Sequence, residues 1–131
     1  MKRIANLAKR AAGFVLCAAA AIALPAQTFF SFDGTDGAYP LAAFVQATNR
    51  YLYGTTEAGG TSDLGTVFRI TPGGKLTTLH SFSGADGEYP YANRLIQASN
   101  GDSYGTTFSG GANGNGTVFK MTPSGKLNDA A

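Results

Sequence analysis

The stretch YGTTEAGGTSDLGTVFRITPGGKL at residues 53–76 recurs as YGTTFSGGANGNGTVFKMTPSGKL at residues 104–127. The two stretches align without a gap, and 15 of their 24 positions are identical. The flanking segments repeat as well, because TFFSFDGTDGAYP at residues 28–40 returns as TLHSFSGADGEYP at residues 78–90. A self-similar period of this size indicates a repeat architecture. The sequence therefore predicts one domain, residues 27–131, built from two copies at about 28–82 and 83–127.

Each copy shows short strands separated by turns. Side chains alternate between the two faces of a strand, and in Gly65–Thr71 this places Phe68 and Ile70 on one face. The Pro-Gly-Gly at 72–74 and the Pro-Ser-Gly at 123–125 then predict hairpins with a left-handed glycine. We expect strands at about 43–48, 51–56, 65–71 and 75–82 in the first copy, and 94–99, 102–107 and 116–122 in the second, with no eighth strand after Leu127.

The hairpin between the first two strands of each copy carries different turn residues in the two copies. Asn100-Gly101 is a strong two-residue hairpin signal. Asn49-Arg50 stands at the same place in the first copy, and arginine adopts positive φ poorly. We therefore expect a looser turn in the first copy.

The expected fold is all-β, with two four-stranded antiparallel meanders that resemble β-propeller blades. Thr28–Phe32 matches the expected missing eighth strand, and propellers close when the first strand completes the last blade. A propeller needs about four to eight blades, so three alternatives remain: a ring formed by several chains, a fragment of a longer array, or two sheets stacked as a sandwich. Uncovered apolar sheet faces predict self-association of the chain.

The first 26 residues have the plan of a secretory signal peptide. Four basic residues open the chain, an apolar run follows from Ala11 to Leu24, and Pro25-Ala26 offers a cleavage site. The run is too short for a membrane-spanning helix. We expect a protein that is secreted or held at the cell surface, in the extracellular or periplasmic space.

The composition of the remaining chain excludes several classes of function. Beyond residue 26 there are six basic and eight acidic residues, a net charge of −2, so a basic footprint for nucleic acid is missing. The only cysteine, Cys17, lies in the predicted leader, and the only histidine is His80. This inventory lacks the side chains of zinc sites and of Ser-His-Asp or Cys-His catalysis. We assign no catalytic, cofactor-binding or metal-binding residues, and we expect no enzyme activity.

Two sets of polar or aromatic residues are candidates for binding. The carboxylates of Asp33, Asp36, Asp86 and Glu88 could hold calcium, although aspartate before glycine more commonly forms a turn with its own backbone. The aromatic set is four tyrosines that recur at matched positions. They can stack on sugars, contact a protein or pack between strands: Tyr39, Tyr53, Tyr89 and Tyr104.

The sequence carries a signature of short motifs: YGTT, a glycine pair, GTVF followed by a basic residue and a TP turn, GKL, LHSF and GxDGxYP. This signature resembles that of the Gloeo/Verruco repeat family. Its elements cover most of residues 28–127. The resemblance implies an exported, propeller-like bacterial repeat protein, of a kind whose carboxyl-terminal anchors vary, and it implies no particular activity. We therefore expect a binding or structural module at or outside the cell surface, with two alternatives: a lectin-like carbohydrate-binding propeller, or a fragment of a longer array.

Overall fold

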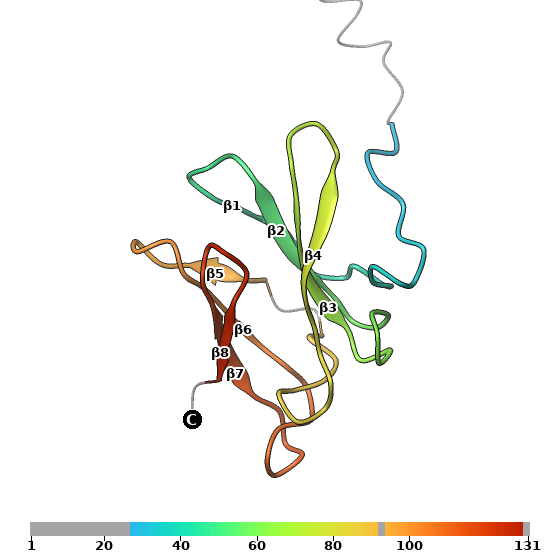
Figure 1. The fold of residues 1–131 in the computed structure, drawn as a ribbon, viewed down its shortest axis with the longest axis vertical. Coiled ribbons are helices and arrows are strands. Elements are labelled where there is room, and N and C mark those ends of the chain that lie inside the picture. The colour runs from blue at the N-terminus through green and yellow to red at the C-terminus, as the bar shows by residue number, and fades with distance from the viewer. Residues whose placement is uncertain (1–26, 92–93, 130–131) are drawn as a thin grey trace, which may run out of the picture.

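The computed structural model describes residues 27–91 and 94–129, and this part of the chain contains strands and no helix (Figure 1). The strands form two antiparallel meanders, sheet 1 with the order β1-β2-β3-β4 and sheet 2 with the order β5-β6-β7-β8. The expected all-β fold with two four-stranded meanders is confirmed, and the sheets do not close into a barrel. Strand bounds are β1 Val45–Gln46, β2 Leu52–Thr56, β3 Thr66–Ile70, β4 Leu76–Ser81, β5 Ile96–Gln97, β6 Ser103–Thr106, β7 Val118–Met121 and β8 Leu127–Asp129.

Two expectations about the ends of the chain were wrong. An eighth strand is present, because the Thr122–Lys126 turn returns the chain so that Leu127 pairs with Met121. Thr28–Phe32 is not a strand; it runs beside sheet 1 and places the Phe32 ring 5.1 Å from that of Phe68. The predicted signal peptide lies outside the described residues. Within the described residues, no helix is long and apolar enough to cross a membrane.

The first hairpin turn is the same in both copies, so the expectation of a looser turn in the first copy was also wrong. The amide of Arg50 donates to the Ala47 carbonyl and the amide of Gly101 donates to the Ala98 carbonyl, both at 2.9 Å. Each turn is a three-residue loop rather than a two-residue one, and Arg50 has the left-handed φ of 69° that Gly101 adopts at 88°. The Asn49 side chain accepts from the Tyr51 amide at 3.0 Å and helps to hold Arg50 there.

The core lies between the two sheets. The inner face of sheet 1, with Tyr53 and Val67, packs against the inner face of sheet 2, with Leu95, Phe119 and Met121. Phe82 follows β4 and crosses to sheet 2, where its ring lies 5.3 Å from that of Phe119.

The other faces of the two sheets differ in what covers them. The outer face of sheet 1 carries Phe44 and Phe68 and is partly covered by Phe32. The outer face of sheet 2 carries Ile96, Tyr104 and Val118, which are all exposed. The two sheets therefore stack face to face, and each has an outer face that points away from the other sheet. That this stacking continues into a propeller stays a prediction.

Candidate functional site

Threonines and glycines of the repeated signature join the central strands of each sheet to the Asp-Gly loop that precedes them in the sequence. The hydroxyls of Thr56 and Thr66 lie 2.8 Å apart, and Thr66 donates to the Asp36 carbonyl at 3.1 Å. In the second copy, Thr107 and Thr117 lie 2.9 Å apart, and Thr117 donates to the Asp86 carbonyl at 3.2 Å. The conserved geometry of the two copies shows that these motif residues position the loop.

The glycine that follows each of these aspartates is required by space. A Cβ on Gly37 would lie 2.5 Å from the Thr56 methyl carbon, and one on Gly87 would lie 2.6 Å from the Thr107 methyl carbon. Such separations are far inside van der Waals contact, so the loop lies directly on the threonine pair. The DG and GT elements of the signature thus have a structural role.

The aspartates predicted as turn formers or calcium ligands are engaged in turns. Asp33 accepts from the amide of Thr35 at 2.9 Å and from its hydroxyl at 2.7 Å. The Thr35 hydroxyl and amide hold the pKa of the Asp33 carboxyl below its usual range. Asp36 accepts from the Asp33 amide at 3.1 Å. Across residues 27–91 and 94–129, no three His, Cys, Asp or Glu side chains gather as a metal-binding group. The hydrogen bonds of Asp33 and Asp36 are those of turn formation.

His80 packs against an aromatic ring at the end of β4. Its ring lies edge-on to Phe82 at 5.0 Å, as Phe30 lies edge-on to Phe32 at 5.2 Å in the matching segment at residues 28–32. The Nε2 atom also lies 2.6 Å from Asp86 Oδ2. Burial opposes ionisation of Asp86, but hydrogen bonds from Ser83 and His80 outweigh it and lower the pKa of the Asp86 carboxyl. The contact between His80 and Asp86 therefore holds the loop that contains Asp86 against β4.

A group of exposed aromatic side chains lies where the two repeats meet. Glu57 of the first repeat, Tyr89 and Tyr91 of the connecting loop and Phe108 of the second repeat line a cavity of about 290 Å³, here called the junction pocket. The rings of Tyr91 and Phe108 lie 6.4 Å apart and are tilted by 59°. Both rings are exposed, so the pocket opens to solvent.

The backbone at the junction pocket is held in an unusual conformation. Tyr89 has a φ of 54°, and its counterpart Tyr39 has a φ of 56°. Positive φ at a residue with a large side chain costs about 1 kcal/mol or more and often accompanies function. The Tyr89 carbonyl accepts from the Phe108 amide at 2.9 Å, which ties the two sides of the pocket together.

The four matched tyrosines have different roles. Tyr53 is buried in the core and Tyr104 lies on the outer face of sheet 2, whereas Tyr39 and Tyr89 are exposed on loops. Glu57, Tyr91 and Phe108 were not predicted from the sequence, because these positions differ between the two copies and so carry no repeated pattern. Leu41 stands where the second copy has Tyr91, and Glu57 stands where it has Phe108.

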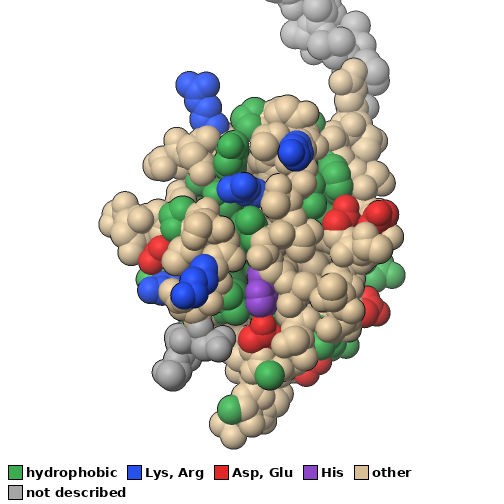
Figure 2. Space-filling view, in the orientation of Figure 1, with side chains coloured by type: hydrophobic (Ala, Val, Ile, Leu, Met, Phe, Trp, Pro, Cys, Tyr) green, Lys and Arg blue, Asp and Glu red, His purple; other side chains and the backbone are tan. Residues whose placement is uncertain are grey.

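Charge on the face seen in Figure 2 is mixed, with Lys and Arg side chains in its upper and left parts and acidic side chains mostly toward its right and lower edges. One ion pair joins Lys120 to Asp102 at 3.7 Å. At the matched position in sheet 1, the Arg69 guanidinium lies 5.2 Å from the Tyr51 ring centre. The two cations on the central strands are thus partnered within their own sheets.

The expected family resemblance is confirmed by comparison with known families. The family model described as the Gloeobacter/Verrucomicrobia repeat matches residues 20–129. The match covers both copies and begins within the predicted leader. No curated protein matches the sequence.

Proposed function

Because the chain belongs to the Gloeobacter/Verrucomicrobia repeat family, we propose that it is an exported, non-enzymatic repeat module that binds a ligand at or outside the cell surface. Export is supported by the basic start, the apolar run Ala11–Leu24 and the small residue Ala26. The non-enzymatic role is supported by the use of the signature residues. The threonine pairs and the aspartates that form turns hold the loops, and their polar atoms do not converge on a cleft.

The junction pocket is the observation that carries the binding role. Tyr89, Tyr91 and Phe108 present aromatic surface around a cavity of about 290 Å³, and Glu57 adds an acidic residue to its lining. Aromatic rings with a polar partner suit ligands that have both apolar faces and hydroxyl groups. A carbohydrate has this combination, because its ring C–H groups pack on an aromatic side chain while a carboxylate accepts from its hydroxyls. We therefore propose a glycan as the ligand class.

A glycan array with the full chain tests this proposal, followed by a titration of each hit by fluorescence or NMR. Tyr91→Ala and Phe108→Ala should each weaken binding of a hit about 10-fold or more, because each removes one exposed ring from the pocket. Tyr39→Ala is the matched control: it removes an exposed tyrosine with the same backbone conformation outside the pocket. A folded protein that binds no glycan, or that loses binding equally with Tyr39→Ala, would contradict the proposal.

A structural role is the second candidate function, and the one-directional stacking of the sheets favours it. Such a module would serve through assembly, without a soluble ligand. A folded, assembling chain that stays silent on the array would support this alternative over the glycan-binding one.

A further inference from the structure

We propose that the outer face of sheet 2 docks onto the outer face of sheet 1 of a second copy of this chain, so that copies associate head to tail. The contact between sheets 1 and 2 within one chain supplies the template. This inference does not depend on the junction pocket or its ligand.

Matched residues on the two sheets differ sharply in exposure. Val67 is 0% exposed and Tyr53 2% exposed, because the inner face of sheet 1 is covered by sheet 2. Their counterparts on the outer face of sheet 2, Val118 and Tyr104, are 60% and 37% exposed, and neighbouring Ile96 is 66% exposed. The local sequence of this face is the same in both copies at GTVF and YGTT. The outer face of sheet 2 is therefore a docking face whose partner sheet is not supplied by the described chain.

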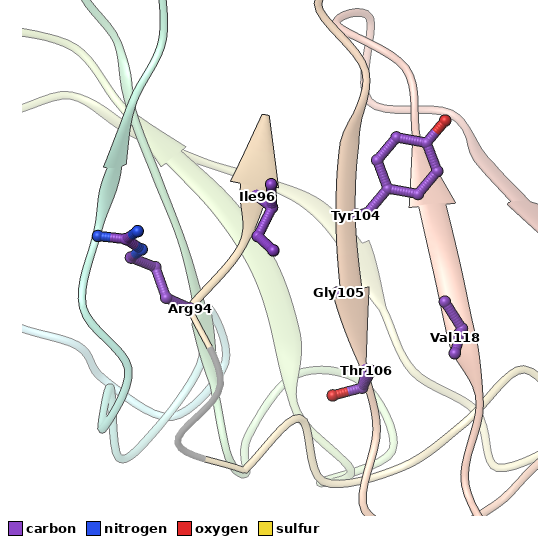
Figure 3. Close-up of a pocket in the computed structure, with 6 residues that line it drawn as sticks. All are labelled: Arg94, Ile96, Tyr104, Gly105, Thr106 and Val118. Atoms are coloured by element: carbon purple, nitrogen blue, oxygen red, sulfur yellow. The ribbon is translucent and has the colours of Figure 1, made fainter. Parts of the chain in front are cut away.

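Side chains of this face line a shallow pocket of about 360 Å³ (Figure 3). Ile96 comes from β5, Tyr104 to Thr106 from β6 and Val118 from β7. Gly105 lies between Tyr104 and Thr106 in this lining (Figure 3), and a Cβ on it would point to the inner face, into the side chains of Phe119 and Leu95. Its counterpart Gly54 is buried in sheet 1, where Phe68 on the opposite face would meet an added Cβ at 2.7 Å.

The complementary surface is the outer face of sheet 1. Phe44 there is 49% exposed, whereas its counterpart Leu95 is 1% exposed because sheet 1 covers it. A cavity of about 270 Å³ remains between sheet 1 and the N-terminal segment, lined among others by Phe30, Phe44 and Phe68. In the contact between sheets 1 and 2, side chains such as Tyr53 and Val67 fill the matching space. Tyr104 and Val118 of a second copy have the same identities and fit this place.

Two separate segments of the chain match the two parts of β4 in sequence, and each lies at one of the two docking surfaces. β8 matches Leu76–Thr78 at the start of β4. Thr28–Phe32 matches Thr78–Phe82, which is the end of β4 together with Phe82. Thr28–Phe32 already lies on sheet 1 as the end of β4 lies on sheet 2. Phe29 lies near the Gly74 turn and Leu79 near the Gly125 turn. In the docked pair, Thr28–Phe32 of one copy continues the line of β8 of the other.

Association between two different faces produces a closed ring when the rotation between copies closes, and an open chain of copies when it does not. This geometry predicts a distinctive behaviour of face variants. Val118→Lys disables one face and leaves the outer face of sheet 1 intact. Phe44→Lys does the reverse. Each variant alone should lose association by about 10- to 100-fold, while an equimolar mixture should form a discrete dimer through the two intact faces.

The test is light scattering after size exclusion of the full chain, its two face variants, their mixture and the control Phe108→Lys. Phe108 is an exposed apolar residue outside both faces, so its variant should assemble like the wild type. Circular dichroism of each variant verifies that it is folded. The expected result is a wild-type oligomer, two monomeric face variants and a heterodimer on mixing.

Three outcomes would overturn the proposal. A wild type that stays monomeric at about 100 μM would mean that no second copy docks. Loss of association in Val118→Lys alone would indicate pairing between two identical faces of sheet 2. Equal association of all four proteins would place the contact elsewhere, for example in the apolar leader.

Discussion

Replacing Arg50 with glycine is expected to stabilise the protein. Arg50 has a φ of 69°, a conformation that costs a residue with a Cβ about 1 to 2 kcal/mol. Glycine removes that cost but loses about 0.5 to 1 kcal/mol of backbone freedom on folding. The Arg50 side chain is exposed, so little packing is lost. The net gain should be about 0.5 to 1 kcal/mol.

Chemical denaturation followed by circular dichroism measures this gain. We expect a higher midpoint concentration of denaturant and an unchanged dependence of the unfolding free energy on denaturant concentration. Arg50→Ala separates the side chain from the backbone, because it removes the guanidinium but keeps the Cβ, and it should leave the free energy of unfolding nearly unchanged. The reciprocal Gly101→Arg should destabilise, since a Cβ there also meets Pro123 at 3.1 Å. If Arg50→Gly were no more stable than Arg50→Ala, left-handed strain at this turn would be refuted as the cause.

Three further changes have expected outcomes. Thr55→Val should stabilise the protein by about 1 kcal/mol in a thermal melt, because the Thr55 hydroxyl is buried without a hydrogen-bond partner. The neighbouring Thr56→Val is the control and should destabilise the protein by about 1 to 2 kcal/mol, since the Thr56 hydroxyl bonds Thr66 and the Ala58 carbonyl. The pKa of Asp86 is lowered from 3.8, so its stabilising effect is present above about pH 4 and is lost as the pH falls below that value; denaturation between pH 2 and pH 6 should show a smaller acid loss for Asp86→Asn than for the wild type, and parallel curves would contradict this linkage. Expression in an exporting bacterial host should yield a mature chain that begins close to residue 27, as read by intact mass, and an exported chain that retains Met1 would contradict a cleaved leader.

The candidate site was only partly accessible from the sequence. Repetition identified Tyr39 and Tyr89 as a matched pair, and the structure shows both exposed with positive φ. The junction pocket itself combines Glu57 and Phe108, which belong to different repeats and replace one another at the same repeat position. A pocket formed between copies has no signature within a copy, so only the packing of the two repeats brings its residues together.

The sequence by itself determined the two copies, the all-β meanders and most of the strands, because the alternation of apolar side chains and the turn chemistry are local. The hairpins at Gly74 and Gly125 were predictable for this reason, since proline and glycine restrict the backbone directly. Tertiary structure decided the left-handed Arg50, the strand β8 and the position of Thr28–Phe32 beside sheet 1. It also decided that Val67 is buried while Val118, in the same GTVF motif, is exposed. The physical reason is that burial depends on whether another sheet covers a given face, and identical local sequences carry no information about that neighbour.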